Sequence, residues 1–295
     1  MRYVSSSMLN TFQACPRKCE HAYIDKRVPV SEAAPLAFGK VFHVALAAWF
    51  KGGPGDAVGA LQTGAKGLPP EDAAKMCALL GHYAPPFAGW KVEGVEKNFE
   101  VPIRSPASGR SMAGYRLVGR VDVVAVNPDG ARFIIDHKTT SSEIVGFGAY
   151  WQALQVDSQM ANYCEAFDAR GFVYDVIRKP SIKLCGKDNG EDGQPSPDRY
   201  QARIEEAIKV APAEWYQWRE FIKTDEERQA GRADLYQTVQ MFHSCARRGT
   251  WPRNSGACVN RFGTCQYLDV CSGRASLGDD SIFRTKVEEH EELKE

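Results

Sequence analysis

Two carboxylates and one amine lie in two neighbouring strand-like runs of the sequence. Asp122 lies in the first run, and Asp136 and Lys138 lie in the second. The residues between the runs, 127–130, are Asn-Pro-Asp-Gly. Pro suits the first central position of a type I turn, Asp suits the second, and Gly can adopt the left-handed conformation that follows. The two runs are therefore predicted to form an antiparallel hairpin with a three-residue loop.

The predicted turn also fixes the register of this hairpin. Asn127 then faces Ala131, and the same register places Asp122 opposite Asp136. Because side chains alternate along a strand, Asp136 and Lys138 share one face. Directly opposed side chains lie about 4.5–5.5 Å apart at Cβ, so the two carboxylates and the ammonium should form one cluster.

Two carboxylates this close on apolar strands repel each other, and a divalent cation relieves that repulsion. Hard oxygen ligands favour Mg²⁺ or Mn²⁺. A protonated Lys138 cannot bind the metal, but it can stabilise negative charge on an attacked phosphate or orient a hydroxide. The alternative is a solvated outer sheet face, on which the two carboxylates pair with Arg120 and Lys138.

The residue types around these three groups resemble a known family. Residues 119–122 read Gly-Arg-Val-Asp, and after hydrophobic residues and a turn, 134–140 read Ile-Ile-Asp-His-Lys-Thr-Thr. This combination resembles the core of the PD-(D/E)XK nuclease superfamily, in its RecB-like branch. The resemblance implies an α/β fold: a restriction-endonuclease-like core with a mixed central sheet flanked by helices. It also implies that the backbone carbonyl of His137 joins Asp122 and Asp136 as a metal ligand.

Three positions before the hairpin are further candidates. Residues 38–43, Phe-Gly-Lys-Val-Phe-His, look like the first motif of RecB-like nucleases, which implies that His43 is a metal ligand. Neutral imidazole is a common ligand, although a lone His in an apolar helix is often a hydrogen-bonded core residue. Glu96 and Glu100 are weaker candidates, and the sequence does not choose between them.

A polar stripe follows the hairpin. Gln152, Gln155, Gln159 and Tyr163 recur at helical spacing in a helix predicted over 150–168. Gln159 and Tyr163 resemble the last motif of the same branch, which implies that they position the substrate. The alternative is an ordinary solvated helix face.

The cysteines suggest a second centre. Cys258, Cys265 and Cys271 lie within a loop-like segment, where thiolates can surround one metal centre. The resemblance to RecB-like nucleases implies Cys15, near the N-terminus, as the fourth ligand, and Cys19 is the alternative. Four thiolates suit either zinc or iron–sulfur, so spacing alone does not decide the metal.

The family resemblance favours iron over zinc. One upstream cysteine and three near the C-terminus resemble the layout of AddB nucleases, CRISPR-associated RecB-like proteins and many phage recombination nucleases. That layout implies a [4Fe–4S] cluster, with zinc as the alternative. The cluster would act as a C-terminal cysteine-rich lock that ties both ends of the chain into one domain.

Hydrophobic periodicity and turn residues predict the remaining elements. Helices are expected at 36–50, 71–83 and within 200–248, strands at 95–103, 115–126, 131–140 and 172–179, and loops at 51–70 and 185–200. Residues 51–90 then form a helical insertion. The predicted organisation is a single nuclease domain over 1–275 and an acidic C-terminal tail over 276–295.

The composition is that of an ordinary globular protein, with 43% hydrophobic and 25% charged residues, which disfavours disorder and coiled coil. No apolar run of about 18 residues predicts a membrane span, and the N-terminus lacks an apolar signal core. We therefore expect a cytoplasmic protein with no membrane partner, and the family resemblance implies a bacterium or a phage-infected host. The 37 basic and 37 acidic residues balance, but 241–275 contain five Arg and one acidic residue. This basic stretch could contact the phosphate backbone of DNA, with Trp251, Phe262 and Tyr267 stacking on bases. The alternative is that the Arg side chains are scattered and solvated and that the aromatic residues belong to the core.

The predicted activity is metal-dependent hydrolysis of phosphodiester bonds in DNA. The resemblance implies an exonuclease of recombination, repair or phage DNA processing, acting on single-stranded or end-containing DNA. A helicase, a recombinase or a single-strand-binding protein would be its partners, and no Walker motif supplies unwinding within this chain. The alternatives are a DNA-trimming subunit of the CRISPR-adaptation type and a noncatalytic DNA-binding module that keeps the fold and cluster.

Overall fold

A mixed six-stranded sheet lies at the centre of the computed structural model, which describes residues 1–30, 34–260, 263–287, 290 and 293. The strands are β1 (Arg2–Ser5), β3 (Lys91–Arg104), β4 (Ser111–Val126), β5 (Arg132–Thr140), β6 (Gly171–Arg178) and β7 (Tyr216–Ile222). Their order is β1-β4-β5-β6-β7, with β3 also paired to β4. The β1–β4 and β5–β6 pairs are parallel and the others are antiparallel. The predicted α/β class with a mixed sheet is confirmed.

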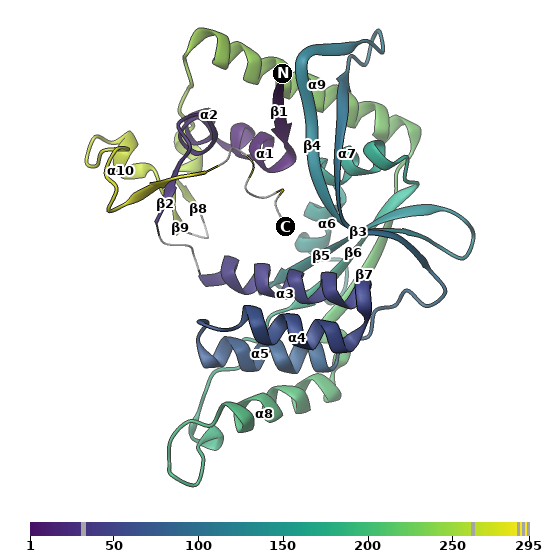
Figure 1. The fold of residues 1–295 in the computed structure, drawn as a ribbon, viewed down its shortest axis with the longest axis vertical. Helices are drawn as coiled ribbons and strands as arrows, with labels where there is room; N and C mark the ends of the chain where they lie inside the picture. The colour runs from purple at the N-terminus through teal and green to yellow at the C-terminus, as the bar shows by residue number, and fades with distance from the viewer. Residues whose placement is uncertain (31–33, 261–262, 288–289, 291–292, 294–295) are drawn as a thin grey trace.

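Helices pack on both faces of this sheet (Figure 1). The α-helices are α1 (Ser6–Ala14), α2 (Pro16–Cys19), α3 (Ala34–Gly52), α4 (Pro54–Gly64), α5 (Pro70–Gly81), α6 (Ala149–Gln155), α7 (Ser158–Phe167), α8 (Pro197–Val210), α9 (Asp225–Arg248) and α10 (Leu268–Cys271). Two small sheets pair β2 (Arg27–Pro29) with β10 (Phe283–Thr285) and β8 (Val259–Asn260) with β9 (Gly263–Thr264). No helix within the described ranges is both long and apolar enough to span a membrane.

The long strand β4 changes its partner along one edge. Residues 115–118 pair there with β1, and residues 123–126 pair with β5. On the other edge β4 pairs with β3 along most of its length. Residues 119–122 therefore lie where β1 ends and the β4–β5 ladder has not yet begun. Asp122 is at this junction, and the sequence pattern did not predict β1.

The β4–β5 hairpin has the predicted register. Val123 pairs with Ile135 and Val126 pairs with Arg132. The turn closes with a 2.9 Å hydrogen bond from the Asn127 amide to the Ala131 carbonyl, and Gly130 adopts a positive φ of 83°. Local turn chemistry was sufficient for this prediction because the turn residues adjoin both strands.

Three predicted elements differ from the structure. Residues 51–70 contain helix α4, because burial of Ala57 and Leu61 offsets the low helix propensity of its glycines. The helix predicted over 150–168 is divided into α6 and α7, since Asp157 is extended and caps α7 by accepting from the Gln159 amide. The helical stretch predicted over 200–248 contains β7, which completes the sheet beside β6.

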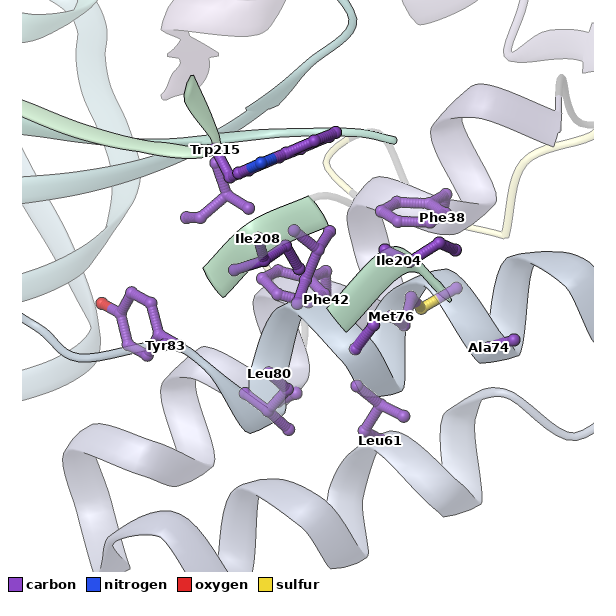
Figure 2. Packing of buried hydrophobic residues seen from close by; sticks show 14 of the residues in the cluster. Phe38, Phe42, Leu61, Ala74, Met76, Leu80, Tyr83, Ile204, Ile208 and Trp215 are labelled. Carbon is purple, nitrogen blue, oxygen red and sulfur yellow. The ribbon is translucent and has the colours of Figure 1, made fainter. Parts of the chain in front are cut away.

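A hydrophobic cluster fixes the position of α3 against α4, α5 and α8. Figure 2 shows Phe42 of α3 lying among Ile204, Ile208 and Leu80. Phe42 has no exposed surface. Because His43 follows Phe42 directly, this packing determines where the imidazole enters the site.

The two ends of the chain lie side by side. The C-terminal helix α10, yellow in Figure 1, lies near α2, which is purple. The Arg17 amide donates to the Pro252 carbonyl, and the Tyr267 hydroxyl donates to the Arg27 carbonyl. The predicted acidic tail, 276–295, contains β10, which pairs with β2. This part of the tail is therefore attached to the N-terminal segment.

Glycine substitutions test the packing of β6 against β7. A Cβ at Gly171 would lie 2.3 Å from the Phe221 carbonyl oxygen, so Gly171→Ala should lower the free energy of unfolding by about 1–3 kcal/mol. A Cβ at Gly59, inside α4, meets no atom within 4 Å, so Gly59→Ala should raise it by about 0.5–1 kcal/mol. Urea denaturation measures both. A Gly171→Ala protein as stable as the wild type would contradict the close approach of these strands.

Candidate functional site

Asp136 and Lys138 form a close ion pair on one face of β5. The Lys138 Nζ lies 2.6 Å from the Asp136 Oδ2 and 5.6 Å from the centre of the Tyr174 ring. The Asp136 side chain is only 6% exposed. The predicted sharing of one face by these two residues is confirmed.

Burial and neighbouring charges shift both groups of this pair. Burial raises the pKa of Asp136 to about 6, with a further increase from Asp122 and an opposing decrease from Lys138. Burial alone lowers the pKa of Lys138, but the charges of Asp136 and Asp122 raise it above its ordinary value. Near neutral pH, Asp136 is therefore mainly ionised and Lys138 is protonated. Lys138 can act as a fixed positive charge and not as a base.

Asp122 and His43 meet beside the backbone of His137. The Asp122 Oδ2 accepts a 2.8 Å hydrogen bond from the His137 amide and lies 3.5 Å from the His43 Nδ1. The His43 ring in turn hydrogen bonds the His137 carbonyl. Burial lowers the pKa of His43, so the neutral imidazole predominates near neutral pH, and this is the form that binds metals. Three of the predicted metal ligands are thus brought together.

The ring of His137 packs edge-on against the His43 ring, with the ring centres 6.3 Å apart, and it also belongs to a buried network. Its Nδ1 lies 2.9 Å from the Asp175 Oδ2, which also accepts a 2.5 Å hydrogen bond from the Tyr83 hydroxyl. The side chains of His137 and Asp175 are 2% and 3% exposed. Asp175 was not predicted. An isolated acid in the apolar run of β6 was the signal that could have identified it, since buried carboxylates need partners.

Gln159 and Tyr163 remain together, but the longer stripe does not. The Gln159 Nε2 donates a 2.8 Å hydrogen bond to the Tyr163 hydroxyl. Gln152 and Gln155 lie on α6, a different helix. The Tyr163 ring packs against Gly119, where a Cβ would lie 3.1 Å from that ring and 2.5 Å from the ring of Phe99. Because residue 119 has no side chain, the Tyr163 ring has room to lie against the strand and reach the site.

The two glutamates left open by the sequence occupy different environments. Glu96 has a positive φ of 52°, which is uncommon for a residue with a side chain, and it pairs with Arg120 at 2.7 Å. Burial raises its pKa, and the charge of Asp122 raises it further. Glu100 is half exposed and pairs with Arg116. Glu96 is therefore the glutamate that borders Asp122.

The chemistry of this donor set fits a hard divalent cation. The Asp122 carboxylate lies 3.5 Å from the neutral His43 imidazole, and its negative charge adds to the effect of burial in raising the pKa of Asp136. Carboxylate oxygens are ligands that Mg²⁺ and Mn²⁺ prefer. Among the described residues, no three His, Cys, Asp or Glu side chains are already arranged around a single metal position.

All four predicted cluster cysteines line one small cavity. These are Cys15, Cys258, Cys265 and Cys271, with Lys18 and Arg253 beside them. Burial raises the pKa of Cys271, as do the neighbouring Cys15 and Cys265. The alternative ligand Cys19 is fully buried elsewhere, with its thiol 3.7 Å from the Met8 carbonyl. The structure therefore places Cys15, and not Cys19, beside the three C-terminal thiols.

The aromatic residues of the basic stretch do not form the expected surface. Trp251 and Tyr267 are 3% and 0% exposed, because both belong to the core that joins the chain ends. They are therefore unable to stack on bases, and this prediction is wrong. Phe262 and Arg261 lie outside the described residues.

Two tyrosine substitutions test the buried network. Tyr83→Phe removes a hydrogen bond to a buried carboxylate and should lower the free energy of unfolding by about 1.5–3 kcal/mol. Tyr216→Phe is the control, since its hydroxyl donates to the neutral Leu79 carbonyl, and its effect should be about 0.5–1.5 kcal/mol. Chemical denaturation at one pH compares them. Equal effects would show that Asp175 is not a charged acceptor.

Comparison with known proteins shows the family to which this chain belongs. The family model of the PD-(D/E)XK nuclease superfamily matches residues 3–272. A structure from Eubacterium rectale, described as a "putative exonuclease", is 13% identical with a TM-score of 0.53, covering 92% of this chain and 88% of that one. The structure of SSO0001 is 15% identical with a TM-score of 0.35, covering 81% and 76%. No curated protein matches. The chain belongs to the PD-(D/E)XK nuclease superfamily.

Proposed function

We propose that this protein is a metal-dependent DNA exonuclease of the RecB-like branch, hydrolysing phosphodiester bonds in recombination, repair or phage DNA processing. The observation that carries the proposal is the meeting of Asp122 and His43 at the His137 backbone, beside the Asp136–Lys138 pair. The structure described as a "putative exonuclease" shares the fold of this chain, and an activity of that kind would attack DNA from an end.

In the proposed mechanism, Mg²⁺ or Mn²⁺ would be held by His43, Asp122, Asp136 and the His137 carbonyl. The bound cation would lower the pKa of a water and polarise the scissile phosphate. Lys138 is held protonated by Asp136 and Asp122, so it can stabilise charge that develops on the attacked phosphate. Gln159 and Tyr163 are hydrogen bonded to each other and present polar groups for positioning the substrate.

Substitution of Asp136 tests the active site. Asp136→Asn keeps the size of the side chain but removes the charge that binds the cation and the ammonium, and it should lower the rate of DNA digestion by at least about 100-fold. Asp129→Asn, in the exposed turn of the same hairpin, is the matched control and should digest DNA at the wild-type rate. The measurement is release of nucleotides from end-labelled linear DNA with Mg²⁺ or Mn²⁺.

Two controls complete this experiment. Chelation with EDTA should stop digestion, and closed circular DNA should resist it. Digestion of circles would show an endonuclease. Equal rates for wild type and Asp136→Asn would exclude the assigned site, and a wild type that binds DNA without digesting it would indicate a noncatalytic module.

We also propose that Cys15, Cys258, Cys265 and Cys271 hold a [4Fe–4S] cluster. Their position around one cavity supports a shared centre, and the cysteine layout of RecB-like nucleases supports iron. Such a cluster would join α2 to α10 and so stabilise the contact between the chain ends. Any helicase, recombinase or single-strand-binding partner would act from another chain.

Cysteine substitutions test the cluster. Cys265→Ser should abolish bound iron and acid-labile sulfide in protein purified without oxygen, because a ligand is lost. Cys185→Ser is the control, since Cys185 is exposed and remote from the cavity, and it should retain both. Elemental analysis and the visible absorption spectrum measure the result. Zinc in place of iron would contradict the cluster assignment and leave the nuclease assignment unaffected.

A further inference from the structure

We propose that Phe147 is a stacking site for an unpaired nucleobase of the DNA strand that enters the active site. The inference rests on the proposed nuclease function and adds a binding site to it. It is carried by a loop, residues 141–148, that connects the end of β5 to the start of α6.

This loop is held in place from three directions. Ile144 is fully buried in the core beneath α6, and its carbonyl accepts a 2.8 Å hydrogen bond from the Trp151 Nε1. The Gly146 carbonyl accepts a 2.6 Å hydrogen bond from the Arg219 Nη2. Val145 lies between these two anchoring residues and Phe147 follows the second, and the side chain of each is 47% exposed. The loop thus displays two apolar side chains on a backbone that is already ordered.

Arg219 supports the exposed ring. Its guanidinium carbon lies 5.2 Å from the centre of the Phe147 ring and 4.8 Å from that of the Trp151 ring. A guanidinium at this distance is attracted to an aromatic face. It also places a positive charge beside the ring, where the phosphate of a stacked nucleotide would be attracted. Ordering the ring in advance reduces the entropy lost when a base binds.

The loop adjoins the proposed catalytic groups. It begins directly after Thr140, two residues beyond Lys138. Tyr150, three residues beyond Phe147, hydrogen bonds Thr140 and lies near the charges of Lys138 and Asp136. The neighbouring β5 and β6 are parallel, and ligands of α/β sheets commonly bind beyond the carboxyl ends of such strands.

The chemistry of this surface favours a nucleobase over a protein. One aromatic and one aliphatic side chain are far fewer than the roughly 20–30 residues that each partner contributes to a stable protein interface. One ring backed by a cation, next to a phosphodiester-cleaving site, instead suits a single base, because every base has a π-face.

The test uses full-length protein carrying Asp136→Asn, so that DNA binds without being digested. The probe is a single-stranded oligonucleotide with one 2-aminopurine, placed in turn at each position near the labelled end, with Ca²⁺ present. At one position the intact Phe147 should quench the fluorescence by stacking. Phe147→Ala should remove this quenching and weaken binding by roughly tenfold, and Phe147→Trp should restore both.

Trp218→Ala is the matched control. Trp218 is 46% exposed on the neighbouring position of β7, and alternation turns it to the opposite face from Arg219. This variant should leave quenching and affinity unchanged. An oligonucleotide with an abasic site at the responsive position should bind with equal affinity to the proteins with Phe147 and with Phe147→Ala.

The outcomes separate this inference from the proposed function. If wild-type protein digests DNA but Phe147→Ala changes neither quenching nor affinity, the stacking site is wrong and the nuclease assignment stands. Loss of affinity that persists with abasic DNA would also overturn base stacking. If wild-type protein neither binds nor digests DNA with any metal, the proposed function itself fails.

Discussion

The hydrogen bond from the His137 amide to the Asp122 carboxylate joins β4 to β5 at the point where their regular pairing ends. It gives Asp122 a fixed orientation without a strand partner on that edge. Because the same backbone carries Asp136 and Lys138 on either side of His137, this one contact sets the position of Asp122 relative to Asp136 and Lys138.

Because several charged side chains of this arrangement are buried, each of them needs a partner. Asp136 and Asp175 are nearly inaccessible to water, and buried charges are retained in proteins when they are paired. Lys138 pairs with the first, and His137 and Tyr83 bond the second. The strand β5 is thus anchored by charge on both of its faces. Anchoring of this kind restricts the movement of the groups on β5. Phosphoryl chemistry requires such groups to be held within a small distance of their reactive positions.

Contacts between distant parts of the chain deliver the other groups. The cluster around Phe42 draws α3 onto the helices α4, α5 and α8 and so brings His43 to Asp122. At the opposite end, the N-terminal segment contacts the cysteine-rich C-terminal segment through Tyr267 and Arg27. Loop-closure entropy opposes such long-range contacts, and a shared metal centre would offset part of it.

Features that depend on neighbouring residues could be predicted from the sequence: the β4–β5 turn and register, the common face of Asp136 and Lys138, and the pairing of Gln159 with Tyr163. Turn conformation and strand alternation act over a few residues, so the order of residue types is sufficient to predict them. The three-dimensional structure was needed for the partners of Asp175, for the position of Glu96 beside Asp122, and for the burial of Trp251. Each depends on residues that are remote in the chain, and burial against such residues overrides local propensity.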